Sequence, residues 1–158
     1  MSPVKYMKAL LGIKDVEAFW EAREEILKTG KKHFLVRVLC IVIRRHYGSG
    51  IPVKQDINRF RTPHGFHGIF ISKNAKIGDG CTIFHQVTIG AECCKKSGGA
   101  PTIGKNCYIG AGAKIIGNVV VGNNVRIGAN AIVVNDVPDN CTVVMNKPRV
   151  IVRKNEKI

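Results

Sequence analysis

The chain has 158 residues, 45% of them hydrophobic, a composition that fits one domain with a buried core and excludes disordered chains and integral membrane proteins. Its 25 Lys and Arg residues outnumber 11 Asp and Glu residues, which gives a formal net charge of +14. This excess indicates an anionic partner, such as nucleic acid, a membrane surface, an acidic glycan or a phosphate-rich cofactor, or else a solvated basic surface.

Targeting and metal signals are absent from the sequence. The six cysteines have no metal-ligand spacing, and the first residues lack the apolar stretch of a signal peptide. The apolar run 34–43 contains Arg37 and is too short to cross a bilayer. We therefore predict no membrane span and a reducing, cytoplasmic location.

The first part of the chain, 1–50, is predicted to be a helical segment. Its first amphipathic pattern places Val16, Phe19, Trp20, Ile26 and Leu27 on one face. A second helix is expected over 34–47, where the following Gly-Ser-Gly-Ile-Pro ends it.

An aliphatic residue at every sixth position replaces the helical pattern from residue 71 onward. The repeated positions are Ile71, Ile77, Ile83, Ile89, Ile103, Ile109, Ile115, Val121, Ile127 and Val133. A period of six matches neither an α-helix, which has about 3.6 residues per turn, nor a flat strand, which alternates every 2 residues. It suits a short strand followed by a tight turn, and three such units close a triangular coil of about 18 residues. We predict a parallel β-helix over 51–145, followed by a tail over 146–158.

Two irregularities interrupt the repeat. Fourteen residues separate Ile89 from Ile103, so eight extra residues must leave the coil as a loop over 91–101. Such a loop is usually functional, although a surface excursion is the alternative.

The second irregularity lies upstream. Pro63 is expected to keep the beat set by Ile51 and Ile57, but eight residues then separate it from the next repeated position, so two residues must bulge around His64 and His67. Bulges concentrate near active sites.

Several segments of the repeat resemble the hexapeptide-repeat acyltransferases, and most closely the serine acetyltransferase branch and its relatives in polysaccharide gene clusters. The resemblance covers residues 45–150. It rests on Asn74-Ala-Lys-Ile-Gly, Val87-Thr-Ile-Gly, Lys96-Ser-Gly-Gly, Pro101-Thr-Ile-Gly-Lys-Asn-Cys-Tyr-Ile-Gly-Ala-Gly-Ala-Lys-Ile-Ile-Gly-Asn118, Arg126-Ile-Gly-Ala-Asn-Ala-Ile-Val-Val and Asp136-Val-Pro-Asp-Asn. It implies left-handed coiling, a homotrimer, acetyl-CoA as the acyl donor, and a loop that covers an active site between subunits.

The histidines are the candidates for the chemistry of acetyl transfer. Moving an acetyl group from a thioester to a hydroxyl requires a base for the hydroxyl proton, and a neutral imidazole suits this task. His64 is the first candidate, because it resembles the family histidine that precedes a Gly-Ile pair. His67 is the rival, and His85, one coil after His67, is the third candidate. No Ser-His-Asp order or Gly-x-Ser-x-Gly motif is present, so we expect direct transfer without a covalent enzyme intermediate.

Glycine and alanine residues at two corners have small side chains or none, so the pantetheine arm of acetyl-CoA could lie against the backbone there. The resemblance implies that acetyl-CoA lies along this groove, with basic residues near its phosphates and no metal. The predicted cofactor-binding residues are Gly110, Ala111, Gly112, Ala113, Lys114, Gly128, Ala129, Lys147 and Arg149. The last two are assigned from their position near the C-terminus, where the sequence departs from the family's Gly-x-Pro-Ala.

Departures from the family also bear on the acceptor. Serine acetyltransferases have an Arg-His pair before the proline that ends the loop, whereas this chain has Gly99 and Ala100. Without the arginine, no guanidinium fork is evident for a serine carboxylate. We therefore predict a sugar or polysaccharide hydroxyl as the acceptor, with L-serine as the alternative.

Two hypotheses come from other classes. A non-catalytic β-helix acting as a scaffold or basic binding protein agrees with the charge, but one Trp and three Tyr are too few to stack bases, so no nucleic-acid partner is predicted. A zinc site, as in the left-handed β-helix carbonic anhydrases, would use His64, His67 and His85 as ligands.

Overall fold

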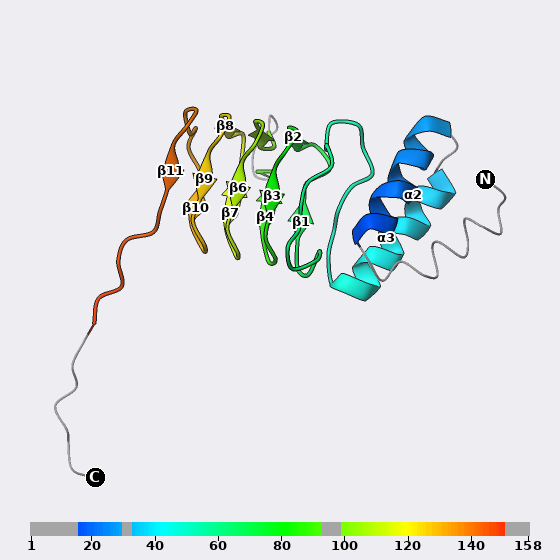
Figure 1. Ribbon diagram of the computed structural model, residues 1–158, viewed down its shortest axis with the longest axis horizontal. Helices are drawn as coiled ribbons and strands as arrows, with labels where there is room; N and C mark the ends of the chain where they lie inside the picture. The colour runs from blue at the N-terminus through cyan, green and yellow to red at the C-terminus, as the bar shows by residue number, and fades with distance from the viewer. Residues whose placement is uncertain (1–15, 30–32, 93–98, 151–158) are drawn as a thin grey trace, which may run out of the picture.

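The computed structural model describes residues 16–29, 33–92 and 99–150. Two helices lie at one end of a solenoid of short strands, and an extended segment leaves the other end (Figure 1). The helices are α2 (Val16–Thr29) and α3 (His33–Tyr47). The strands are β1 (Phe70–Ile71), β2 (Lys76–Ile77), β3 (Thr82–Ile83), β4 (Thr88–Gly90), β5 (Thr102–Ile103), β6 (Tyr108–Ile109), β7 (Lys114–Ile116), β8 (Val120–Val121), β9 (Arg126–Ile127), β10 (Ile132–Val133) and β11 (Thr142–Val143). Within these described ranges, neither helix has the length and apolar character needed to cross a bilayer.

The strands form three parallel sheets, in the orders β1-β4-β7-β10, β3-β6-β9-β11 and β2-β5-β8. Phe70 pairs with Thr88, eighteen residues later, which is one complete coil of three units. Across the interrupted coil Thr88 pairs with Lys114, twenty-six residues later, so eight residues do leave the coil. The predicted fold, a left-handed parallel β-helix preceded by short helices, is confirmed.

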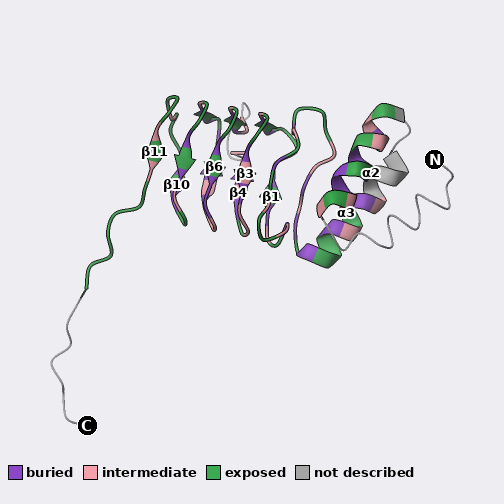
Figure 2. Ribbon diagram, in the orientation of Figure 1, coloured by how far each residue is buried: buried purple, intermediate pink, exposed green. Residues whose placement is uncertain are grey.

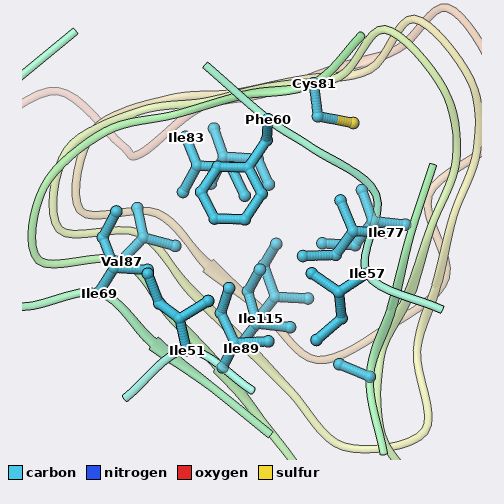
Figure 3. Close-up of a cluster of buried hydrophobic side chains, with 14 of the residues drawn as sticks. Ile51, Ile57, Phe60, Ile69, Ile77, Cys81, Ile83, Val87, Ile89 and Ile115 are labelled. Atoms are coloured by element: carbon cyan, nitrogen blue, oxygen red, sulfur yellow. The ribbon is translucent and has the colours of Figure 1, made fainter. Parts of the chain in front are cut away.

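The core runs along the axis of the solenoid, because the repeated aliphatic side chains of all three sheets point inward. Figure 3 shows Ile57, Ile77, Ile83 and Ile89 converging in this core. All ten aliphatic positions of the repeat are at most 6% exposed, and the outward positions of the strands alternate with them (Figure 2). Burying one such side chain contributes about 1.5–3 kcal/mol, so the repeat supplies its own core.

Helix α2 covers the end of the solenoid through aromatic packing and one buried cation. Trp20 packs against Phe66 of the first coil, with ring centroids 6.0 Å apart. Arg23, 5% exposed, donates to the carbonyl oxygens of Lys54 and Ile57. Burial lowers the pKa of Arg23, with a smaller opposing effect of a nearby glutamate. The helices therefore form one hydrophobic core with the first coil.

The prediction that Pro63 keeps the six-residue beat is wrong. Pro63 is exposed, whereas Phe60, 2% exposed, fills the core (Figure 3). The extended part of the first coil ends at Arg61, which bridges to Thr82 of β3, and Pro63 lies beyond it in a turn.

Candidate active site

The candidate histidines lie at the corner where the β3-β6-β9-β11 sheet passes into the β1-β4-β7-β10 sheet. His67 and His85 occupy the same place in consecutive coils, because the Gln86 amide donates to the His67 carbonyl oxygen at 2.8 Å. Equivalent hydrogen bonds join His85 to the coil after it and that coil to the next, so Ala111 and Ala129 occupy this place in the next two coils. We call these four positions the histidine corner.

His64 reaches the histidine corner from a bulge in the first coil. Residues 63–68, which we call the histidine turn, form this bulge. Arg61 aligns with Thr82 of the next coil, and His67 aligns with His85. The first coil therefore has three more residues between these two positions than the next coil has. A bulge is present as predicted, but it holds three extra residues where the spacing from Pro63 predicted two. It carries both of its histidines on an exposed surface.

The end of α3 holds the histidine turn in place. The Gly68 amide donates to the Tyr47 carbonyl oxygen at 3.1 Å, and the Ser49 hydroxyl donates to the Phe66 carbonyl oxygen. Ser49 also accepts a hydrogen bond from the Ile69 amide at 3.2 Å. Gly68 has a φ of 66°, a conformation that glycine adopts without strain. Sequence reasoning interpreted the segment around Ser49 only as a helix stop and missed this positioning role.

The imidazoles of His64 and His85 stack face to face. Their ring centroids are 5.1 Å apart and the planes differ by 13°. His67 instead packs edge-on against Tyr47, at 5.1 Å and 71°. His64 and His67 are exposed and His85 is half-buried. The arrangement brings His64 and His85 together as a pair and leaves His67 on the α3 side.

The histidine pair has no carboxylate partner in the described part of the chain. The ion pair found there joins Glu17 and Arg59, on the α2 side of the first coil. The Nδ1 atom of His85 is buried and has no hydrogen-bond partner among the described residues. Buried polar atoms are usually paired, so this atom needs a group from outside the described residues or a bound molecule.

Several residues of the predicted cofactor groove lie at the histidine corner or directly beneath it. Above the His85 ring, the corner side chains shrink to the methyl groups of Ala111 and Ala129, which leaves uncovered surface beside the histidine pair. Gly112 lies on the same corner and Ala113 faces the core, where it is 0% exposed. Ala113 therefore forms the floor beneath the corner and has no free surface of its own.

The ammonium group of Lys114 lies at the corner and is bound to the backbone there. Its ammonium group donates to the carbonyl oxygens of Gln86 and Gly112, both at 2.8 Å. These oxygens belong to two consecutive coils, so Lys114 ties together the coil that contains His85 and the next one. Its charge lies at the corner, but two of its hydrogen-bond donors are already used.

The glycines of the predicted groove have a structural role of their own. A Cβ atom at Gly110 would lie 2.7 Å from the Ala129 backbone nitrogen, and one at Gly128 would lie 3.2 Å from the Val143 oxygen. Equivalent glycines on the sheet opposite the corner show the same crowding: a Cβ at Gly78 would lie 2.7 Å from the next coil. The glycines are therefore required by coil packing, and they do not by themselves indicate a cofactor.

Lys147 and Arg149 lie apart from the histidine corner. Both are exposed in the extended segment that follows β11 and leaves the solenoid (Figure 1). The loop predicted over 91–101 begins after the carboxyl end of β4, whereas His85 precedes the amino end of that strand. The Glu92 amide donates to the Gly99 carbonyl oxygen at 3.2 Å where the two ends of the loop meet. Residues 93–98 of this loop and 151–158 of the tail lie outside the described residues.

Two outward aromatic residues beside the histidines were missed by sequence reasoning. The Phe84 ring lies 5.4 Å from that of His64, and the Tyr108 ring lies 5.0 Å from that of Phe84. Phe84 occupies the strand position that Gly110 and Gly128 occupy in later coils. A large residue in a column where the next two coils have glycine is the signal that would have found it.

The histidines do not form a metal site within one chain. Among the described residues, no group of three His, Cys, Asp or Glu side chains is arranged to hold a metal ion. The zinc hypothesis therefore lacks a ligand set in this part of the chain.

Comparison with known proteins finds serine acetyltransferases among the relatives of this chain. The family described as bacterial transferase hexapeptide (six repeats) matches residues 100–135. The serine acetyltransferase of Bacillus pumilus is 36% identical over 155 residues, which cover 97% of this chain and 71% of the relative. That of Staphylococcus xylosus is 39% identical over 132 residues, which cover 82% of this chain and 60% of the relative.

Solved structures of serine acetyltransferases share this fold. Isoform 3 from Entamoeba histolytica, in complex with cysteine, matches with a TM-score of 0.71 and 30% identity. The enzyme from Neisseria gonorrhoeae, in complex with serine, matches with a TM-score of 0.68 and 29% identity. These matches cover 87% and 83% of this chain but 49% and 54% of the solved chains, so this chain spans about half the length of those structures.

Proposed function

Because this chain belongs to the serine acetyltransferase family of hexapeptide-repeat transferases, we propose that it transfers an acetyl group from acetyl-CoA to a hydroxyl, with L-serine as the acceptor. The stacked pair of His64 and His85 is the observation that carries this proposal. It lies in the same column as the small side chains of Ala111 and Ala129, which supports a donor site next to the base.

The reaction requires one proton to leave the acceptor hydroxyl as its oxygen attacks the thioester carbonyl. Acetyl-CoA, when bound, supplies a thioester carbonyl that a hydroxyl oxygen can attack. The exposed imidazole of His64 accepts the proton of the acceptor hydroxyl as that oxygen attacks, and it returns the proton to the departing thiolate. The half-buried His85 stacks against this ring and fixes its orientation, which is a positioning role. A positioned base of this kind contributes about 10²–10⁴-fold to the rate.

The proposed acceptor differs from the acceptor predicted from the sequence. A sugar hydroxyl was preferred because Gly99 and Ala100 replace an Arg-His pair, but the relatives named above are serine acetyltransferases. L-serine therefore replaces the sugar as the first candidate.

A sugar hydroxyl remains the second candidate, and one observation favours it. A Cβ atom at Gly99 would lie 2.4 Å from Oδ1 of Asn118 and 2.5 Å from its Cβ, so the described backbone has no room for an arginine at this position. If the acceptor is L-serine, another cation must bind its carboxylate.

We also propose that the active form is a homotrimer. The ends of the 91–101 loop follow β4 and so lie away from His85, which precedes β4. The family resemblance implies that such a loop covers an active site between subunits, which supports a trimer. Outward apolar residues of the solenoid support an assembly: Val120, Ile132 and Val134 are each more than half exposed. Light scattering coupled to size-exclusion chromatography measures the mass directly, and a mass of one 17.3 kDa chain would reject the trimer.

The decisive assay is release of free thiol from acetyl-CoA, with L-serine and a panel of sugars as acceptors. We expect serine-dependent turnover in the wild type, a loss of 10²-fold or more in kcat in His64→Ala, and a smaller loss in His85→Ala. His46→Ala is the matched control, because His46 is an exposed histidine of α3 outside the corner. Turnover with sugars alone would select the second candidate. Absence of turnover with every acceptor, together with absence of acetyl-CoA binding, would leave the non-catalytic scaffold hypothesis.

A further inference from the structure

Three aromatic rings lie in series on the outer face of the β3-β6-β9-β11 sheet, and the proposed base is the first of them. The His64 ring lies 5.4 Å from the Phe84 ring, and the Phe84 ring lies 5.0 Å from the Tyr108 ring. Tyr108 is 42% exposed and Phe84 is half-buried. We call Phe84 and Tyr108 the aromatic strip. A molecule that reaches His64 across this sheet therefore passes over the aromatic strip.

The coil geometry does not require a ring at either position of the aromatic strip. Tyr108 points outward, and the equivalent positions in the neighbouring coils are Thr82 and Arg126. Phe84 lies in a column where the next two coils have glycine. Apolar side chains that gather on an exposed surface beside a reactive group indicate a binding site. We therefore look for a ligand whose hydroxyl reaches His64 while the rest of it covers the two rings.

The charges on this face favour an anionic ligand. Arg61 is next to Thr82 in the outward column, and Arg126 is next to Tyr108. Both arginines are exposed, and neither has an ion pair with any described residue. The strands β3, β6, β9 and β11 contain no Asp or Glu. This local positive charge, within a chain of net charge +14, attracts anions.

A carbohydrate fits these features better than a nucleobase does. The apolar CH groups of a sugar ring pack against an aromatic ring, and its hydroxyls stay free to react. The rings of Phe84 and Tyr108 are tilted by 53°, so a flat base can stack in parallel on only one of them. A sugar also brings the hydroxyl that the proposed chemistry requires at His64.

We propose that the aromatic strip and Arg126 bind an acidic glycan, and that one of its hydroxyls accepts the acetyl group as an acceptor besides L-serine. The sugar unit that reacts lies on Phe84, and the next unit reaches Tyr108 and Arg126, where its carboxylate binds the guanidinium. His64 takes the hydroxyl proton, the new ester bond forms, the thioester bond breaks, and the thiolate of CoA receives the proton. This further activity rests on the proposed function, whereas binding of the glycan does not.

Tetragalacturonic acid is the probe, because every sugar unit in it carries a carboxylate. Its fully methyl-esterified form keeps the rings and hydroxyls but has no charge, and the galacturonic acid monomer tests the need for a second unit. Calorimetry with the full-length protein measures binding, and thiol release from acetyl-CoA measures transfer. We expect tetragalacturonic acid to bind about 10-fold more tightly than either the ester or the monomer, and more weakly as salt is added.

Matched variants test the rings and the charge separately. Phe84→Leu and Tyr108→Leu keep apolar volume but remove the flat ring, and each is expected to weaken binding of tetragalacturonic acid about 10-fold. Arg126→Gln is expected to remove most of the preference for the acid over its ester. The controls are Phe70→Leu and Lys76→Gln, which change an exposed aromatic residue and an exposed cation on the other two sheets. Circular dichroism and thermal melting confirm that each variant is folded.

The outcomes separate this inference from the proposed function. Serine-dependent turnover in a protein that does not bind tetragalacturonic acid would overturn the glycan site and leave the proposed function intact. Binding that depends on Phe84 and Arg126, without acetyl transfer to any acceptor, would keep the glycan site and overturn the proposed function.

Two further results would assign the aromatic strip to something else. A higher KM for acetyl-CoA in Phe84→Leu, with glycan binding unchanged, would place the donor on the strip. A smaller mass for Tyr108→Glu than for the wild type in light scattering would make the strip a contact between subunits. Either result would overturn the inference.

Discussion

Phe66 connects the helical segment to the histidines, and replacing it tests whether that connection matters for catalysis. Its ring is 0% exposed and packs against Phe19 and Trp20 of α2, with centroids 4.9 and 6.0 Å away, and against Tyr47 of α3 at 5.6 Å. Truncating a buried phenylalanine to alanine costs about 3–5 kcal/mol. Because domains of this size have only about 5–15 kcal/mol of stability, Phe66→Ala should remove a large part of it. Phe66→Leu keeps most of the apolar volume and should lose about 1–2 kcal/mol, mainly from the aromatic contacts.

The assay combines urea unfolding with kcat measured where each variant remains folded. We expect Phe66→Leu to lower kcat about 10-fold or more, because Phe66 lies between His64 and His67 in the turn and a small displacement of the base is expensive for catalysis. Ile103→Ala is the stability control, since Ile103 is 2% exposed on the sheet opposite the histidine corner and its truncation costs about 2–5 kcal/mol. Equal kcat values in the wild type, Phe66→Leu and Ile103→Ala would refute the idea that the helical packing positions the histidines.

Three further predictions concern stability and reactivity. Gly104→Ala should destabilise the fold by about 1–3 kcal/mol in urea unfolding, because its Cβ would lie 2.6 Å from a carbonyl oxygen of the next coil; unchanged stability would refute this account of coil packing. Hydrogen bonds from the backbone and then the side chain of Asn123 lower the pKa of Asp139 from its usual 3.8. Since the unfolded chain binds this proton at higher pH, the contribution of Asp139 is present above about pH 4 and is lost as pH falls through its lowered pKa. Wild-type stability should therefore fall more between pH 5 and pH 3 than that of Asp139→Asn. A side-chain hydrogen bond between the two thiols, followed by burial, raises the pKa of Cys81, and the same hydrogen bond lowers the pKa of Cys107 to about 7. Because both thiols are at most 1% exposed, both should resist iodoacetamide until the protein unfolds, as peptide mass spectrometry would show.

The parts of the fold that a local pattern encodes were predictable from sequence. The repeat identified all ten inward aliphatic positions, because each six-residue unit places its own side chain independently of distant contacts. The six-residue repeat wrongly predicted an inward position at Pro63, because the register of the first coil depends on its packing against the helices. The contact between His64 and His85 was likewise beyond the sequence, since the turn that carries His64 is held by two hydrogen bonds of Ser49, one donated to Phe66 and one accepted from Ile69.

The comparison between sheets shows which features of a hexapeptide repeat carry information about function. Glycine follows the aliphatic residue on the sheet at the histidine corner and on the opposite sheet, and in both places a Cβ would crowd the next coil. A feature shared by both sheets cannot explain why chemistry belongs to one corner. What distinguishes that corner is the change from His85 to Ala111 along one column, together with Phe84 where later coils have glycine. In a solenoid of this kind the regular residues build the coil, and the residues that break the pattern are therefore the ones to mutate first.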